Sequence, residues 1–247
     1  MKPIIVIPAR LAATRLPNKP LADICGKPMI ARVVERALAS GIKDVVVAAG
    51  DAEILPAAIA AGAKAVLTDA ALPSGSDRVY AALEAIDPAQ DFDVIINLQG
   101  DMPTFDEKLI NIALDVLANN PDCDIATLVS PSTDANEKSD NNLVKAIIAN
   151  SDNPNGSQCL YFSRANAPWG DGAIYRHVGL YVYRRKALEQ FVKAKPSILE
   201  LREKLEQLRA LELGMKIYAG IVEDFPKGVD TAAHLELARE YYGKQNG

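Results

Sequence analysis

The chain has 247 residues, of which 49% are hydrophobic and 24% charged, proportions typical of a globular protein with a substantial core. Its 27 basic and 32 acidic residues give a formal net charge of −5, which argues against a nucleic-acid or anionic-membrane surface held by bulk positive charge. The three cysteines show no Cys-x-x-Cys spacing and no long apolar run occurs, so we expect an unanchored cytoplasmic protein without disulfides or zinc.

Strand-like and helix-like segments alternate in the first half of the chain. Residues 4–7 form a short β-branched apolar run that ends at Pro8, which predicts a buried strand opening onto a loop. Apolar residues at helical spacing predict a helix between Pro28 and Gly41. Further strands are predicted at 45–49, 65–68 and 94–98, and further helices at 52–61, 77–86 and about 109–117. This alternation predicts a doubly wound, mostly parallel α/β sheet that binds ligands beyond the carboxyl ends of its strands.

The pattern changes at about residue 124, because the later strand-like segments are separated by loops instead of helices. These segments are 125–129, 144–149, 159–163 and 177–183. Residues 198–214 have helical periodicity, residues 215–222 are strand-like, and residues 231–242 predict a last helix. No linker separates the halves, so we predict a single domain in which residues 1–123 are one half and residues 124–247 a smaller lobe with a mixed sheet and helices.

A basic loop follows the first predicted strand. Residues 8–20 contain Arg10, Arg15 and Lys19, and guanidinium forks with an ammonium can surround a triphosphate. A solvated basic loop is the alternative interpretation, but the position at a ligand-binding sheet edge favours phosphate. The loop lacks the glycines of a P-loop or a dinucleotide fingerprint, which disfavours those two kinds of site.

Carboxylates suitable for a metal follow two other segments. Asp101 comes just after the strand that ends at Leu98, so it should lie at the same sheet edge as the basic loop. Asp230 could be a second magnesium ligand or the N-cap of the last helix, and spacing alone favours the cap. Ser74 and Gly75 precede a predicted helix, where an ordinary turn with a helix cap is also a sufficient explanation.

Short motifs spread in order along nearly the whole chain carry a family resemblance. They are Pro-Ala-Arg at 8–10, Thr-Arg-Leu-Pro-x-Lys-Pro-Leu at 14–21, Gly-Lys-Pro-Met-Ile at 26–30, Ser-Gly-Ser-Asp-Arg at 74–78, Gln-Gly-Asp at 99–101, Tyr-Phe-Ser-Arg at 161–164, Arg-His-Val-Gly-Leu-Tyr at 176–181, Glu-Lys-Leu-Glu-Gln-Leu-Arg at 203–209 and Gly-Val-Asp-Thr at 228–231. Together they resemble the 3-deoxy-manno-octulosonate cytidylyltransferase (CMP-Kdo synthetase) family. The resemblance implies a nucleotide-diphospho-sugar transferase-like fold, with a nucleotide-binding first half and a second half for sugar binding and dimerisation.

The resemblance also implies a reaction for lipopolysaccharide biosynthesis. The anomeric hydroxyl of 3-deoxy-D-manno-octulosonate (Kdo) would attack the α-phosphate of CTP and form CMP-Kdo and pyrophosphate. Such an in-line attack needs positioning and charge neutralisation more than a covalent nucleophile. On this reading Arg10, Lys19 and Asp101 are catalytic, and Mg²⁺ binds Asp101 and Asp230, which reverses the preference for a cap. The implied nucleotide-binding set is Ala9, Arg10, Arg15, Lys19, Ser74, Gly75, Arg78 and Asp101.

For the sugar, the resemblance implies a pocket with a cation for the Kdo carboxylate and side chains that hydrogen-bond its hydroxyls. The implied residues are Gln99, Arg164, His177, Tyr181, Glu206 and Gln207. By itself, a lone histidine such as His177 is more often a packed or surface residue. The expected partners are CTP, Kdo and a second copy of the chain in a homodimer, and we expect neither nucleic acid nor membrane as a partner.

One residue departs from the family pattern. Met102 stands where many family members have an acidic residue after Gln-Gly-Asp, so Asp101 and Asp230 would have to be sufficient ligands for the metal.

A second functional hypothesis is nucleotidyl transfer to another acceptor, such as a sialic acid or a sugar phosphate, although sugar-phosphate enzymes usually begin with a Gly-x-Gly-x-Arg loop. A third is a nucleotide-binding module that has lost turnover, for which Met102 is the only support. Nucleotide profiling and pyrophosphate release discriminate among the three.

Overall fold

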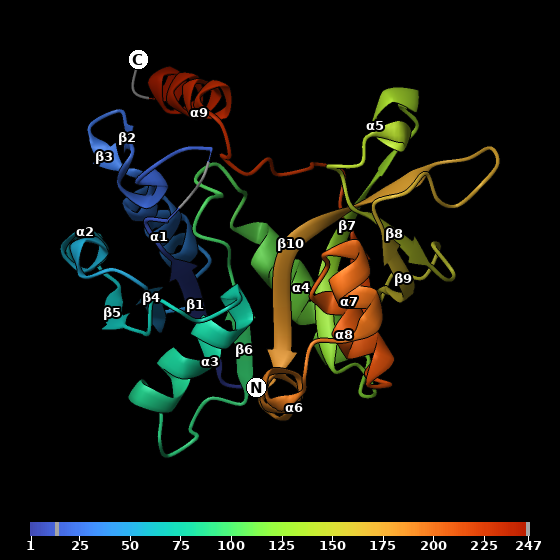
Figure 1. Ribbon diagram of the computed structural model, residues 1–247, viewed down its shortest axis with the longest axis horizontal. Helices are drawn as coiled ribbons and strands as arrows, with labels where there is room; N and C mark the ends of the chain where they lie inside the picture. The colour runs from blue at the N-terminus through green and yellow to red at the C-terminus, as the bar shows by residue number, and fades with distance from the viewer. Residues whose placement is uncertain (13–14, 246–247) are drawn as a thin grey trace. The chain divides into compact units, whose positions relative to one another are not determined.

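The computed structural model describes residues 1–12 and 15–245, and the chain divides into two units (Figure 1). The first unit comprises Met1–Lys108 together with Pro226–Gly247, and the second comprises Leu109–Phe225. This division lies earlier than residue 124, where loops begin to replace helices in the sequence pattern. The C-terminal segment also returns to the first unit, which no local pattern indicates. That both halves make up one domain stays a prediction.

Four parallel strands form the sheet of the first unit, in the order β5-β4-β1-β6. They are β1 (Pro3–Ala9), β4 (Val45–Ala49), β5 (Lys64–Leu67) and β6 (Val94–Asn97). The β-branched run of β1 is fully buried, with at most 1% of any side chain exposed from Ile4 to Ile7, as expected for a strand covered on both faces. Ala9 pairs with Ala49, and Val6 pairs with Asn97. The segments that follow β1, β4 and β6 therefore leave the sheet at the same edge.

Three helices connect these strands. The helix α1 (Met29–Ala39) leads from β1 to β4, α2 (Leu55–Ala60) leads from β4 to β5 after the 3₁₀ turn η2 (Ala52–Ile54), and α3 (Gly75–Ile86) leads back from β5 to β6. Connections between parallel strands are right-handed, so α1 and α2 cover one face of the sheet and α3 covers the other. The first unit is thus doubly wound, as the alternating pattern predicted.

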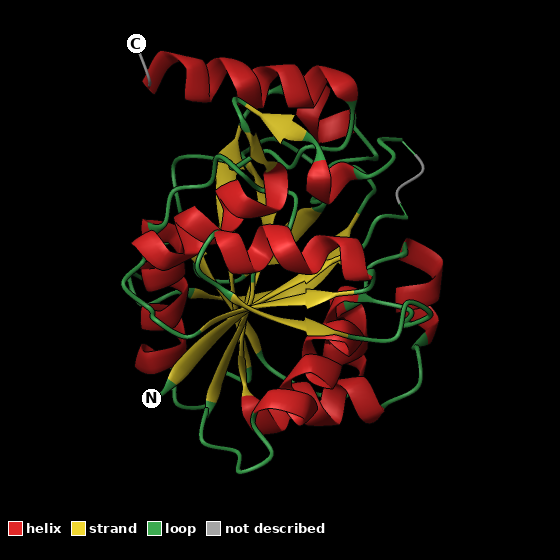
Figure 2. Ribbon diagram, turned by 90° about the vertical axis from the view of Figure 1, so that its left-hand side faces the viewer, coloured by secondary structure: helices red, strands yellow, loops and turns green. Residues whose placement is uncertain are grey.

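The last helix, α9 (Ala232–Gln245), packs on the segment after the basic loop. Figure 2 shows it from the side, as an uninterrupted helix leading to the C-terminus. Its apolar residues join a cluster with the small hairpin β2 (Asp23–Ile24) and β3 (Lys27–Pro28) and with the start of α1. The buried members of this cluster are Ile24, Met29, Val229, Leu235, Ala238 and Tyr242. The cluster fixes the C-terminal segment beside the N-terminal one.

The second unit contains a mixed sheet in the order β10-β7-β11-β9-β8. Its strands are β7 (Ile125–Ser132), β8 (Lys145–Ile148), β9 (Ser157–Ser163), β10 (Ile174–Arg184) and β11 (Ile217–Ile221). Strand β7 pairs antiparallel with β10 and parallel with β11. We expected a smaller mixed sheet in this half of the chain. Among the described residues, however, its five strands outnumber the four parallel strands of the first unit.

Five helices accompany this sheet among the described residues: α4 (Lys108–Asn119), α5 (Ala135–Ser139), α6 (Arg185–Lys193), α7 (Ile198–Glu203) and α8 (Gln207–Glu212). The single helix expected over residues 198–214 is wrong. The Ser197 capping box starts α7, and Lys204 adopts a left-handed conformation with φ of 57°, which ends it. Helical periodicity of the leucines continues across this break, so the sequence pattern did not reveal it. No helix within the described ranges is long and apolar enough to cross a lipid bilayer.

Candidate functional site

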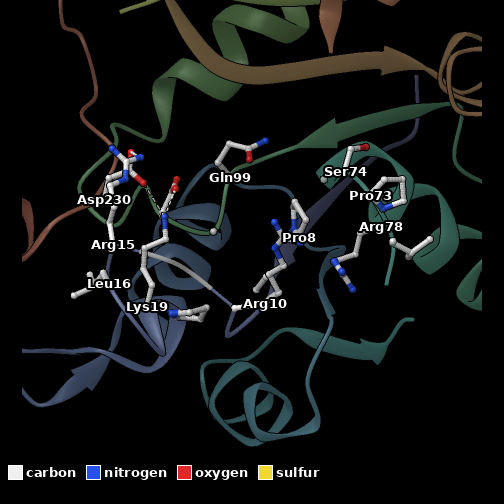
Figure 3. A pocket seen from close by; sticks show the side chains of 17 residues that line it. Pro8, Arg10, Arg15, Leu16, Lys19, Pro73, Ser74, Arg78, Gln99 and Asp230 are labelled. Atoms are coloured by element: carbon white, nitrogen blue, oxygen red, sulfur yellow. Dashed lines mark hydrogen bonds and ion pairs between the residues drawn. The ribbon is translucent and has the colours of Figure 1, made fainter. Parts of the chain in front are cut away.

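A cavity of about 430 Å³ opens at the carboxyl edge of the first unit's sheet (Figure 3). All residues predicted to bind the nucleotide line it: Ala9, Arg10, Arg15, Lys19, Ser74, Gly75, Arg78 and Asp101. Gln99 and Asp230 also line this cavity. Its volume lies in the range of small-molecule sites. The fold therefore brings together segments that are separated along the whole chain.

The basic loop begins directly after β1. Arg10 is exposed and lines the cavity, and the Ala9 carbonyl accepts a hydrogen bond of 2.8 Å from the Gly50 amide. The Leu11 amide donates to the Asp51 carboxylate at 2.7 Å. The segment after β4 thereby fixes the start of the basic loop. Residues 13 and 14, including the threonine of the family-like motif, lie outside the described residues.

Arg78 projects from α3 and is buried, with 2% of its surface exposed. Its guanidinium donates to the Thr68 hydroxyl at 2.6 Å and to the Asp69 carbonyl at 3.0 Å. Burial, together with the nearby charge of Arg10, lowers the pKa of Arg78. Arg78 thus supports the loop after β5 while adding positive charge to the cavity wall. Its contact with a nucleotide stays a prediction.

Ser74 is the N-cap of α3, as the alternative interpretation of this motif suggested. Its hydroxyl oxygen accepts from the Asp77 amide at 3.1 Å and donates to the Asp77 carboxylate at 2.6 Å. The first amides of α3 therefore lie beside the cavity, and a helix N-terminus favours negative charge or an acceptor atom. Gln99 donates to the Asn97 side chain at 3.1 Å, so its amide has a defined orientation at the cavity wall. These amides suit recognition of a polar ring edge or of phosphate.

Lys19 lies between two carboxylates at one end of the cavity. Its ammonium nitrogen is 2.6 Å from Asp101 Oδ2 and 3.1 Å from Asp230 Oδ1, and Figure 3 shows Lys19 and Arg15 pointing toward Asp230. Arg15 forms an ion pair of 3.3 Å with Asp230 Oδ2. Burial disfavours the Lys19 ammonium, but the two carboxylates outweigh burial and raise the pKa of Lys19. Lys19 is therefore protonated at neutral pH.

Asp230 does not cap the last helix, so the interpretation favoured by spacing alone is wrong. Thr231 takes that role, because its hydroxyl accepts from the His234 amide at 3.2 Å. The Asp230 carboxylate instead faces Lys19 and Arg15. A sequence cannot distinguish these roles when two neighbouring residues, Asp230 and Thr231, are both good N-caps. The structure leaves the Asp230 carboxylate available for a cation in the cavity.

The chemistry of the two carboxylates fits a magnesium ion. Asp101 and Asp230 both direct an oxygen at the same cation, the Lys19 ammonium. Met102 is buried, with 5% of its surface exposed, and adds no oxygen ligand. Within the described residues no cluster of three or more metal-binding side chains occurs. Two carboxylates, completed by water and substrate phosphates, are a common magnesium donor set.

His177 and Tyr181 lie together in the second unit, in an aromatic group on β9 and β10. The His177 ring centroid is 5.0 Å from that of Phe162 and 5.3 Å from that of Tyr181. The Thr127 hydroxyl is 3.0 Å from His177 Nε2 and also donates toward main-chain carbonyls of β10. Burial raises the pKa of Tyr181, and Glu206 acts on it in the same direction. The structure thus brings His177, Tyr181 and Glu206 into one neighbourhood.

Gln207 and Arg164 occupy two further positions in this unit. Gln207 is the first residue of α8 and has 5% of its surface exposed. Arg164 follows β9, and its guanidinium donates to the Glu203 carbonyl at 3.1 Å and to the Asn141 carbonyl at 3.3 Å. The Glu203 carboxylate accepts from the Arg164 amide at 3.0 Å. Arg164 is therefore held by the turn between α7 and α8. Sugar binding by these residues stays a prediction.

Burial lowers the pKa of His177 to about 3, against about 6.5 for an unfolded histidine. The folded state therefore binds this proton more weakly than the unfolded state does. As the pH falls below about 6.5, we expect His177 to reduce the free energy of unfolding by up to ~1.4 kcal/mol per pH unit. Imidazole NMR should find His177 neutral above pH 5, with a His177→Asn variant assigning its signals. An imidazole of His177 that titrates near pH 6.5 would contradict this.

Sequence reasoning missed Gly50 and Asp51, which follow β4. A Cβ atom on Gly50 would lie 2.8 Å from Arg78 Nη1, so a larger residue at this place would require the buried guanidinium to shift. Asp51 holds the Leu11 amide. The available signal was positional, because a Gly-Asp pair directly after a buried strand lies at the ligand-binding edge of a parallel sheet.

Comparisons with known proteins show the relatives of this chain. The family model described as cytidylyltransferase matches residues 4–217. A 3-deoxy-manno-octulosonate cytidylyltransferase from Methylobacterium radiotolerans is 55% identical over 96% of this chain and 95% of its own length. One from Rhodospirillum centenum is 52% identical over 99% of this chain and 95% of its own length. A solved structure of CMP:2-keto-3-deoxy-manno-octonic acid synthetase complexed with CTP is 36% identical and has a TM-score of 0.90, covering 99% of this chain and 100% of the other.

Proposed function

We infer the function from the premise that this chain belongs to the family of 3-deoxy-manno-octulosonate cytidylyltransferases, as its full-length identity to them establishes. The chain transfers a cytidylyl group from CTP to Kdo and releases pyrophosphate. It has the α/β fold of nucleotidyltransferases. One observation indicates where in the chain the reaction would occur. It is the cavity that is lined by the basic loop and by the carboxylates of Asp101 and Asp230. The roles of individual residues below are our proposals.

We propose that the basic loop binds the triphosphate of CTP. Arg10, Arg15 and Lys19 reach the cavity from one loop, and their charges would neutralise the α-phosphate and the departing pyrophosphate. Such neutralisation lowers the barrier to in-line attack by the anomeric hydroxyl, because negative charge accumulates on the phosphate oxygens. The first amides of α3, after Ser74, and the Gln99 side chain are suited to hold the base or the sugar. Lys19 and Arg10 are the residues we propose as directly catalytic.

We propose that Asp101 and Asp230 hold Mg²⁺, which would supply positive charge to the phosphates when bound. The support is that both carboxylates face one cation position. Lys19 lines the same cavity, and with these carboxylates occupied by a metal its ammonium would be free to donate to a phosphate oxygen. Asp101 would thus have the largest effect on the reaction, since it makes the shortest contact with Lys19.

We propose that the second unit binds Kdo. Arg164 would pair with the sugar carboxylate, and His177, Tyr181, Glu206 and Gln207 would hydrogen-bond its hydroxyls. A neutral His177, as its lowered pKa implies, can both donate and accept such bonds. This combination suits a polyhydroxylated acid better than a sugar phosphate, which would call for more cations.

We also propose a homodimer that works in the cytoplasm and supplies activated sugar for lipopolysaccharide. Several large apolar side chains of the second unit are exposed, including Leu160 at 54%, Ile198 at 79% and Leu201 at 66%, and a second copy of the chain could cover them. All three cysteines are free thiols, which suits a reducing compartment.

The assay is release of pyrophosphate from CTP, with magnesium and Kdo, followed through a coupled pyrophosphatase. We expect stoichiometric pyrophosphate and CMP-Kdo with CTP, and at least about 100-fold lower kcat/KM with UTP or GTP, because a site that pairs polar base edges rejects the wrong base. Sialic acid and 8-amino-Kdo are tested as alternative acceptors. Absence of pyrophosphate with all three acceptors would overturn the proposed function, and a preference for sialic acid would reassign the substrate.

A further inference from the structure

Tyr242, near the C-terminal end of α9, ties that helix to the segment that carries Asp101. Its side chain is buried, and its hydroxyl donates to the Pro103 carbonyl at 2.6 Å. The Arg32 guanidinium lies over the Tyr242 ring, 4.2 Å from its centroid, and donates to the Ile24 carbonyl at 3.0 Å. Burial raises the pKa of Tyr242 to about 12, so the hydroxyl remains a donor at all ordinary pH values.

A second bond joins the same two segments at the cavity. The Val229 amide donates to the Asp101 carbonyl at 2.8 Å. Val229 directly precedes Asp230, and Pro103 lies two residues after Asp101. A Cβ atom on Gly228 would lie 3.5 Å from Asp101 Oδ1, so the two chains pass each other closely. The turn with Asp101 is therefore bound to the C-terminal segment at two points, the carbonyl of Asp101 itself and the carbonyl of Pro103.

We propose that Tyr242 is a positioning residue for the two carboxylates. Its hydroxyl holds the Pro103 carbonyl at a fixed distance from α9, and α9 continues without a break from the segment with Asp230. The spacing between the Asp101 and Asp230 carboxylates is thereby set by a bond outside the cavity. This inference rests on the proposed magnesium site. It adds that Tyr242, on α9, maintains the geometry of that site.

The apolar cluster alone does not supply this constraint. Ile24, Met29 and Leu235 bury the inner face of α9, and apolar contacts are non-directional. A helix held only by such contacts can slide or rotate slightly without losing burial. A short hydrogen bond to a buried carbonyl removes that freedom. Tyr242→Phe removes the hydroxyl while leaving the ring, its burial and its stacking with Arg32.

The test compares Tyr242→Phe with Tyr241→Phe. Tyr241 is the next residue on the same helix and is partly buried in the same cluster, and its hydroxyl has no hydrogen-bond partner among residues 1–12 and 15–245. Mn²⁺ binding is measured by electron paramagnetic resonance in the presence of CTP without Kdo, and the magnesium dependence of the rate is measured separately. Circular dichroism melting checks that both variants are folded at the assay temperature.

We expect Tyr242→Phe to weaken Mn²⁺ binding by about tenfold and to raise the magnesium concentration for half-maximal rate similarly. Its kcat at saturating magnesium should stay within about threefold of the native value, and Tyr241→Phe should match the native protein. Native-like Mn²⁺ affinity in folded Tyr242→Phe, or equal losses in both variants, would overturn the positioning role. If Asp101→Asn and Asp230→Asn also bind Mn²⁺ like the native protein, the proposed metal site itself fails. The two failures are thereby distinguished.

Discussion

Replacing Asp101 with asparagine is expected to lower kcat for pyrophosphate release by about 10²–10³-fold, with little change in the melting temperature. The carboxylate lies 2.6 Å from the Lys19 ammonium, closer than Asp230 at 3.1 Å, and asparagine keeps its shape while removing its charge. Charged groups placed where charge develops typically contribute effects of this size. Asp230→Asn should act in the same direction but less strongly, because its side chain is more exposed, 42% against 29%.

The matched control for these variants is Asp91→Asn. Asp91 is exposed in the loop that enters β6, at the opposite end of the strand from Asp101. The control should keep native activity, because Asp91 lies far from the cavity. It removes one negative charge, as Asp101→Asn does, and so tests whether charge loss alone lowers the rate. Steady-state kinetics at saturating CTP and magnesium, with Kdo varied, provides the comparison. Losses of equal size in Asp91→Asn and Asp101→Asn would refute the assignment of the site.

Replacing Glu200 with alanine is expected to lower the free energy of unfolding by about 3–5 kcal/mol. Glu200 and Arg209 form a bidentate pair at 2.5 and 2.8 Å that connects α7 to α8, and only 12% and 6% of their side chains are exposed. The Glu200 carboxylate also completes the capping box with Ser197. Without the carboxylate, the Arg209 guanidinium stays buried beside the Phe191 ring with its main counter-charge removed.

This effect should depend on pH in a defined direction. Burial acts to raise the pKa of Glu200, but the hydrogen bonds from Arg209 and the Ser197 amide outweigh it and lower that pKa below its ordinary 4.5. The contribution of Glu200 is therefore fully present above pH 4.5 and is lost as the pH falls through the folded-state pKa. Urea unfolding at pH 7 and at low pH should show a smaller difference between native protein and variant under acid conditions.

The control for Glu200 is the exposed pair of Glu189 with Lys193 on α6. Glu189→Ala should leave the free energy of unfolding at pH 7 almost unchanged, since exposed pairs along a helix contribute little. A variant of Glu200 that is no less stable than this control would show that the buried pair does not stabilise the second unit.

The parts of the fold that were predictable from sequence are those with strong local patterns. The apolar run at residues 4–7 became the central strand β1, and Ser74 became the cap of α3. The break between α7 and α8 was not predictable, because Lys204 is not a residue type that marks a left-handed turn. Leucines continue at helical spacing on both sides of it.

The sequence predicted a set of residues that proves to line the cavity, but it did not predict the contacts among them. Lys19 was expected to face phosphate, and its contacts with Asp101 and Asp230 were not predicted. Arg78 was expected at the nucleotide and lines the cavity, but its bonds to the Thr68 hydroxyl and the Asp69 carbonyl were not predicted. Such long-range pairing depends on which loops the tertiary fold brings together, and no period or turn signal encodes it. The return of the C-terminal segment was not predicted for the same reason, since only contacts in space assign Pro226–Gly247 to the first unit.

The first unit is built from two ends of the chain, whereas the second is one continuous segment. During synthesis all residues of the second unit are therefore present before all those of the first unit, which lacks Pro226–Gly247 until the end. The contact between Lys19 and Asp230 spans 211 positions, and closing so long a loop is a slow step. A nascent or C-terminally shortened chain would thus carry the basic loop without its opposing carboxylate. The cavity with both carboxylates therefore requires the C-terminal segment that carries Asp230.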